Sequence, residues 1–183
     1  MSATPQLEFS STMATVGSKM IKIVPMRQAH YPAVSEIYQK GIDSKIAAFT
    51  TSVPDYSTFN HNHIKDARWV AMINSDVVGW AALSPTSTRH IYRGVAEVSI
   101  YIHPSFQHRG IGKLLMEHLI LESERLGMWT LVAGVISNNV ASVKFHLDCG
   151  FRIVGIRERI GQMDTGEWMD VTWMEKRSLT VGI

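Results

Sequence analysis

Hydrophobic and polar positions change period several times along the chain. Apolar residues that recur at every second position are typical of strands, and spacings of three and four are typical of helices. The pattern predicts strands over 21–27, 68–73, 77–83, 96–102, 130–136, 151–160 and 168–175, and helices over 29–44, 57–66, 112–126 and 137–150. Because strands and helices interleave, we expect an α/β (α+β mixed) fold with about seven strands in a mixed sheet and about four helices.

The two ends of the chain lack this patterning. Residues 1–20 are rich in Ser, Thr and Ala and hold no continuous apolar core, so we expect a disordered N-terminal tail there. The regular pattern covers 21–177, which we interpret as a single domain, and 178–183 as a short C-terminal tail.

Composition narrows the classes of partner. The net charge of +2 is too small to indicate nucleic acid as a partner, and no apolar run reaches the roughly 20 residues that span a bilayer. The single cysteine, Cys149, excludes an internal disulfide framework and suits a cytoplasmic location. The histidines do not have metal-ligand spacing, so we expect no metal.

The stretch 98–119, VSIYIHPSFQHRGIGKLLMEHL, contains the most informative turn. A strand breaks at Pro104, a polar turn with two glycines follows, and an apolar-periodic helix then begins. A helix N-terminus presents unpaired N–H groups and a positive dipole end, so this turn is suited to binding a pyrophosphate. An ordinary strand-to-helix turn is the alternative, and the glycine spacing matches neither a dinucleotide fingerprint nor a phosphate loop.

Two motifs resemble those of one large family. Gln107-x-Arg109-Gly-Ile-Gly resembles the acyl-CoA pyrophosphate loop of the GCN5-related N-acetyltransferase (GNAT) superfamily. The spacing of five later residues is similar to that family's next helix and strand: Asn139, Ser142, His146, Gly150 and Phe151. The resemblance implies the GNAT fold, with a splayed sheet, and acetyl-CoA as co-substrate.

Longer stretches are similar to the phosphinothricin N-acetyltransferase branch of that superfamily. They are residues 38–49, 84–104, 144–151 and 154–176. This resemblance implies acetylation of the α-amino group of small amino-acid analogues, such as phosphinothricin, methionine sulfone and methionine sulfoximine, and a homodimer. The turn at 160–168 departs from the branch: it is one residue longer and lacks a histidine often found there.

The resemblance also implies which residues hold acetyl-CoA. The backbone of Ile100, Tyr101 and Ile102 would pair with the pantetheine arm, which Asn139 would also contact. Helix capping is the alternative role for Asn139, and Asn138 competes for it. The pyrophosphate would lie on the turn formed by Gln107, His108, Arg109, Gly110, Ile111, Gly112 and Lys113.

Two residues are candidates for proton transfer. Glu97 matches the family's proposed catalytic glutamate and would be the general base, because an ammonium must lose a proton before it attacks. An exposed, cross-paired strand carboxylate is the alternative. His146 stands where many family members have a tyrosine; it could act as acid or base, or be a hydrogen-bonded core histidine.

An amino-acid acceptor also needs a carboxylate ligand and a pocket wall. Arg89 matches an arginine in the family's corresponding loop and is the predicted carboxylate ligand, while Arg93 is expected to be a solvated charge. Phe49 has a family match as a wall of the substrate pocket, whereas Trp80 is more often a core residue. Cys149 lies where a buried small residue is expected, so we do not predict an acetyl-cysteine intermediate.

Other functions on the same fold stay open from the sequence. One is N-acetylation of a polyamine or a protein N-terminus, and another is non-catalytic acyl-CoA binding. Both the Glu97 and His146 positions are filled, which favours an enzyme.

Overall fold

The computed structural model describes residues 11–16 and 19–183. Its helices and strands follow the order β1 (Thr12–Val16), β2 (Lys19–Pro25), α1 (Tyr31–Asp43), α2 (Tyr56–Asn62), β3 (Arg68–Ile73), β4 (Asp76–Pro85), β5 (Val95–Ile102), α3 (Ile111–Arg125), β6 (Thr130–Ile136), α4 (Val140–Asp148), β7 (Arg152–Gln162) and β8 (Trp168–Arg177). Short 3₁₀ helices lie at Gln28–His30, His90–Tyr92 and Pro104–Phe106. The mixed α/β architecture predicted from the sequence is confirmed.

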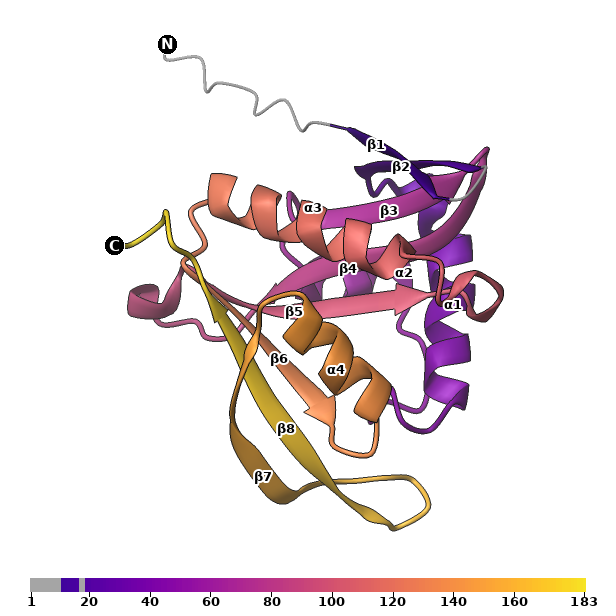
Figure 1. Cartoon of the computed structure of the whole chain (residues 1–183). Helices are drawn as coiled ribbons and strands as arrows, with labels where there is room; N and C mark the ends of the chain where they lie inside the picture. The colour runs from indigo at the N-terminus through magenta and orange to yellow at the C-terminus, as the bar shows by residue number, and fades with distance from the viewer. Residues whose placement is uncertain (1–10, 17–18) are drawn as a thin grey trace.

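The eight strands form one sheet in the order β1-β2-β3-β4-β5-β6-β8-β7. Neighbouring strands are antiparallel except β5 and β6, which are parallel and share three residue pairs. Figure 1 shows these two strands diverging from one end, with α4 lying over the space between them. The sheet is therefore splayed at its one parallel pair.

Helices cover both faces of the sheet (Figure 1). Helix α3 is amphipathic: Ile111, Leu115 and Leu119 recur at four-residue spacing and are buried against Val98, Ile100 and Ile102 of β5. Helices α1 and α2 pack on the opposite face, around Trp80 and Tyr101. Side chains of β5 thus alternate between two cores, as the period of a strand requires.

The N-terminal region differs from its prediction. Thr12–Val16, placed in a disordered tail by the sequence, forms β1 and pairs with β2 along its whole length. The Thr12 hydroxyl also lies 2.9 Å from His118 Nδ1 on α3. These are tertiary interactions that a five-residue pattern does not reveal, and they account for an eighth strand. Of the other residues predicted to be tail, 19–20 belong to β2, and 1–10 and 17–18 lie outside the described residues.

The second helix is shorter than predicted. The pattern favours a helix to residue 66, but α2 ends at Asn62 and His63 has extended backbone. The Ile64 N–H donates to the Leu83 carbonyl at 2.8 Å, and this strand-side bond competes with helix continuation.

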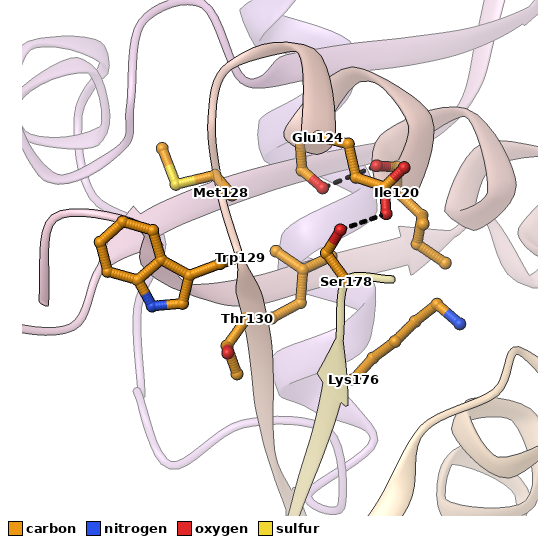
Figure 2. A pocket seen from close by; sticks show the side chains of 9 residues that line it. Ile120, Glu124, Met128, Trp129, Thr130, Lys176 and Ser178 are labelled. Carbon is orange, nitrogen blue, oxygen red and sulfur yellow. Dashed lines mark hydrogen bonds between the residues drawn. The ribbon is translucent and has the colours of Figure 1, made fainter. Parts of the chain in front are cut away.

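The segment after β8 folds back onto the start of β6. Ser178 donates to Glu124 at the end of α3 (2.7 Å), and Arg177 donates to the carbonyls of Trp129, Val181 and Gly182. Figure 2 shows the Ser178 hydroxyl directed toward Glu124, with Lys176 and Trp129 among the other side chains that line a small cavity. Its volume of about 10 Å³ is room for about one water molecule.

Candidate active site

A cleft opens where β5 and β6 separate. Glu97 and Val132 form the last residue pair of the parallel ladder. Beyond this pair, residues 98–102 and 133–136 line opposite sides of a cleft of about 750 Å³, a size typical of small-molecule sites. On the described chain, the edge of β5 that faces this cleft has no strand partner past Glu97, so its backbone groups are open to an extended ligand.

The predicted anion-binding turn lies at the mouth of this cleft. Gly110 is the N-cap of α3 with a left-handed φ of 78°, which favours glycine, and no side chain caps the helix. Most residues of the turn line the cleft: Gln107, His108, Gly110, Ile111, Gly112 and Lys113. The first N–H groups of α3 are therefore available to an anion at this position.

Arg109 is placed differently from the rest of the turn. It is not among the residues that line the cleft, and its guanidinium lies 5.4 Å from the centre of the Phe106 ring. This cation–π contact holds the side chain beside the turn rather than in it.

Glu97 is half-buried and lines the cleft at its apex. Burial raises the pKa of the Glu97 carboxyl above its ordinary value. Within the described part of the chain, its carboxylate has neither a hydrogen-bond donor nor an ion-pair partner. The alternative of a cross-paired strand carboxylate is thus not what the structure contains, and both oxygens are free to accept a proton.

His146 is buried on α4 and also lines the cleft. Its Nδ1 lies 2.8 Å from the Ser142 carbonyl oxygen, and because a carbonyl only accepts, Nδ1 carries the proton. Phe145 and Phe151 pack edge-on against the imidazole. Burial lowers the pKa of His146, so the ring is neutral near pH 7 and Nε2 has a free lone pair. This arrangement favours proton acceptance over donation.

The Tyr101 side chain packs in the core on the same face as Glu97. Its ring stacks on Trp80 at 4.9 Å, and its hydroxyl donates to the Ala47 carbonyl at 3.3 Å. Burial raises the pKa of this phenol well above its usual range. Trp80 is fully buried, as expected for a core residue.

Asn139 is the N-cap of α4, and Asn138 is not. Its Oδ1 accepts from the Ser142 N–H at 3.0 Å, and its Nδ2 donates to the Ile46 carbonyl at 3.2 Å. Asn139 lines the cleft, so its place matches the prediction, while its amide is engaged at both ends by the protein itself.

The two predicted substrate residues lie outside the cleft lining. Phe49 packs against Ile136, Met163 and Met169, and its ring occupies the space where Gly161 lacks a side chain. Arg89 is exposed, with its guanidinium 5.6 Å from the centre of the Tyr92 ring in the same loop. The structure therefore brings Glu97, His146, the turn and Asn139 together, but not these two side chains.

Sequence reasoning missed one wall of the cleft. Ser44, Ile46, Ala47 and Ala48 line it, although the sequence predicts only the end of a helix at Ser44 and a loop after it. It also missed Gly134 in β6, where a Cβ would stand 2.9 Å from Cζ3 of Trp173. A glycine inside an otherwise apolar strand was the available signal for a close approach.

Comparison with known proteins agrees with this geometry. The model of the acetyltransferase (GNAT) family matches residues 34–151. The chain belongs to the GNAT family. This GNAT chain is 30% identical over 155 residues to the L-methionine sulfoximine/L-methionine sulfone acetyltransferase of Salmonella typhimurium, covering 81% of this chain and 89% of that protein. It is 31% identical over 158 residues to a phosphinothricin N-acetyltransferase of Alcaligenes faecalis, covering 82% and 79%.

The similarity extends to the three-dimensional structure of a solved relative. The phosphinothricin acetyltransferase from Sinorhizobium meliloti, crystallised with AcCoA, is 25% identical and superposes with a TM-score of 0.78 over 86% of this chain and 88% of that one. The GNAT fold predicted from the two motifs is confirmed, and the chain is an N-acetyltransferase. No helix among residues 11–16 and 19–183 is both long and apolar enough to cross a membrane.

Proposed function

We propose that this GNAT chain transfers the acetyl group of acetyl-CoA directly to the α-amino group of a small amino-acid-like acceptor. Phosphinothricin, methionine sulfone and methionine sulfoximine represent the class. The observation that carries the proposal is the unpaired Glu97 carboxylate at the apex of the cleft. The names of the relatives in Salmonella typhimurium and Alcaligenes faecalis support the acceptor class.

The chain's part in binding acetyl-CoA follows from the cleft. The open backbone edge at Ile100–Ile102 is suited to pair with the amides of the pantetheine arm, and the N-terminus of α3 is suited to the pyrophosphate. Lys113 adds a positive charge at the mouth. When bound, acetyl-CoA supplies the activated acetyl group; its orientation against the acceptor gives much of the rate.

Glu97 removes a proton from the acceptor ammonium, either directly or through a water molecule. A buried carboxylate with a raised pKa is a stronger base than a free one, and it is closer to the pKa that a general base needs near neutral pH. The neutral His146, with its Nε2 lone pair, is a second acceptor in the cleft wall and would accept a proton or a hydrogen bond.

The acceptor carboxylate is assigned to Arg89 by resemblance, with Phe49 as a pocket wall. Both stay predictions, since neither side chain lines the cleft. An Arg89→Ala variant tests the first: a rise in acceptor KM at constant acetyl-CoA affinity supports the assignment.

We also propose that the protein acts in the cytoplasm as a homodimer. Strand β7 forms one edge of the sheet, and it exposes large apolar side chains at Ile153, Ile156 and Ile160. Exposed Trp168 follows at the start of β8. Such a patch on an edge strand is typical of an interface.

The decisive experiment measures CoA thiol release from acetyl-CoA against a panel of amines. The panel contains methionine sulfone, methionine sulfoximine, phosphinothricin, the common amino acids, spermidine and short peptides. Turnover on the amino-acid analogues is expected. Turnover on spermidine or peptides alone would overturn the acceptor class, and binding of acetyl-CoA without any turnover would favour a non-catalytic protein.

A further inference from the structure

The segment that follows α1, residues 44–49, lies along the cleft and is hydrogen-bonded from two sides. The Ile46 carbonyl accepts from Asn139 at the start of α4, and the next carbonyl, that of Ala47, accepts from Tyr101 on β5. Residues of both α4 and β5 line the cleft. Two consecutive peptide groups of segment 44–49 therefore link β5 to the start of α4.

This segment lies on the face of the sheet that carries Glu97. Glu97, Ser99 and Tyr101 alternate with Val98, Ile100 and Ile102, which pack against the core under α3. The Tyr101 hydroxyl reaches segment 44–49 from the Glu97 face, and Ser44, Ile46, Ala47 and Ala48 line the cleft there. Glu97 and this segment therefore line the same cleft.

Both ends of the segment contact the hairpin of β7 and β8. The Lys45 Nζ lies 3.1 Å from Asp164 in the turn of that hairpin. The Phe49 ring packs over Gly161, where a Cβ would stand 2.4 Å from the ring. The hairpin thus fixes both ends of the segment, and Asn139 and Tyr101 fix its centre.

Asn139 is the member of this set that joins the two halves of the site. Its Oδ1 caps the start of α4, the helix that carries His146, and its Nδ2 binds segment 44–49 on the acceptor side. We propose that Asn139 is a positioning residue, which holds segment 44–49 as the wall that orients the acceptor amine beside Glu97. This inference rests on the proposed function, because it assigns the acceptor to that side of the cleft.

The two roles of the amide are separable by substitution. Asn139→Asp still presents a side-chain oxygen to the Ser142 N–H, and Asp is as good an N-cap as Asn. The variant loses the donor that binds the Ile46 carbonyl. Asn139→Ser removes the same bond without adding a charge and also caps the helix. Asn138→Ser changes the neighbouring exposed amide, which is not the N-cap, and serves as the matched control.

Both Asn139 variants are expected to raise the acceptor KM by about three- to tenfold, the effect of one lost hydrogen bond. The dissociation constant of acetyl-CoA and the melting temperature are expected to stay close to those of the wild type. Tyr101→Phe, which loses the other carbonyl bond, is expected to raise acceptor KM in the same direction. The control variant Asn138→Ser is expected to have the acceptor KM of the wild type.

Two results overturn the proposal. If the Asn139 variants weaken acetyl-CoA binding and leave acceptor KM unchanged, Asn139 is a cofactor ligand. If they change only the melting temperature, Asn139 is a helix cap and nothing more. Hydrogen exchange across residues 45–49 gives a readout that needs no acceptor: faster exchange in both variants is expected. Failure of the wild type to turn over any amine would remove the proposed function while leaving this measurement interpretable.

Discussion

Glu97 of β5 pairs with Val132 of β6 at the point where the parallel ladder ends. A residue one position before Glu97 would be paired with a strand on both sides. A residue two positions after it would have the open cleft, and no strand, on one side. Glu97 thus has a fixed backbone from the ladder and a carboxylate open to the cleft. This combination is what a general base needs, because its position must be rigid while its oxygens remain free.

Replacement of Glu97 by Gln is expected to lower kcat by at least about tenfold, since general bases contribute that much or more. Acetyl-CoA affinity is expected to stay at the wild-type value, because the carboxylate lies at the apex rather than at the anion-binding turn. Thiol release and calorimetry measure the two quantities. Glu36→Gln, an exposed carboxylate on α1, is the control. An unchanged kcat would remove Glu97 from the mechanism.

Stability is expected to fall in mild acid. Burial lowers the pKa of His146 below its ordinary value of 6.5, so the unfolded chain binds more protons than the folded one as pH decreases. The contribution of His146 to the free energy of unfolding is therefore expected to be constant above about pH 7.5 and to drop through pH 6.5. At pH 5.5 one such histidine costs at most about 1.4 kcal/mol.

Chemical denaturation of His146→Phe tests this dependence. The variant has no group to protonate at this position, so its stability is expected to decrease less between pH 7.5 and 5.5. Burial also lowers the pKa of His30, His63 and His118, which keep part of the slope. His90→Gln, an exposed position, serves as control. Equal slopes for His146→Phe and wild type would contradict a buried neutral imidazole.

Gly112→Val is expected to weaken acetyl-CoA binding by at least about tenfold, which corresponds to about 1.4 kcal/mol. A Cβ at this position would stand 3.4 Å from Phe145, so the protein has room for a methyl group, but the remaining branch has to enter the cleft. Calorimetric titration with acetyl-CoA gives the affinity. Gly155→Val on β7, where a Cβ would meet no atom within 4 Å, is the matched control. Equal affinities for the two variants would place the cofactor elsewhere.

Cys149→Ala is expected to retain kcat within about twofold. Burial raises the pKa of the Cys149 thiol to about 11, so almost none of it is the reactive thiolate at neutral pH. Direct transfer then gives intersecting lines in double-reciprocal plots of the wild type. Parallel lines, or an acetylated Cys149 found by mass spectrometry, would instead establish a two-step transfer through this residue.

Ile156→Glu is expected to convert the proposed dimer to a monomer. Ile156 is 61% exposed on edge strand β7, and a buried carboxylate there would oppose association. Light scattering coupled to gel filtration measures the mass. Val140→Glu on α4, at a side chain that is 71% exposed, should leave the mass unchanged. A wild-type chain that is monomeric at micromolar concentration would refute the homodimer.

Local pattern was sufficient for the elements whose signals lie within their own residues. The strand at 68–73 is confirmed with its predicted bounds, and α3 begins and ends one residue earlier than predicted. The predictions for residues 12–16 and for the end of α2 were wrong, because β1 depends on pairing with the next strand, β2, and α2 ends at the bond between Ile64 and the distant Leu83. Propensity carries no information on such contacts.

The same limit explains what could be predicted of the site. The turn before α3 and His146 stand in motifs with fixed spacing, Glu97 matches the position of a family residue, and the structure places all three around one cleft. Segment 44–49 lies in a stretch that resembles the family branch, but its conformation was not predictable because it depends on groups from β5, α4 and the β7–β8 turn. Lys45 even adopts a left-handed φ of 60° that no residue preference would suggest.

The close approach of Trp173 to Gly134 makes the Trp173 indole an intrinsic fluorescent probe of the cleft. Trp69 is 1% exposed and packs in the core with Leu115 and Leu119 of α3, so its emission is expected to be insensitive to a ligand in the cleft. The Trp173 indole lies against Gly134, which lines the cleft, so its environment changes when a ligand covers this glycine. Tryptophan fluorescence of the unlabelled enzyme, compared with that of Trp173→Phe, would therefore follow the filling of the cleft in real time.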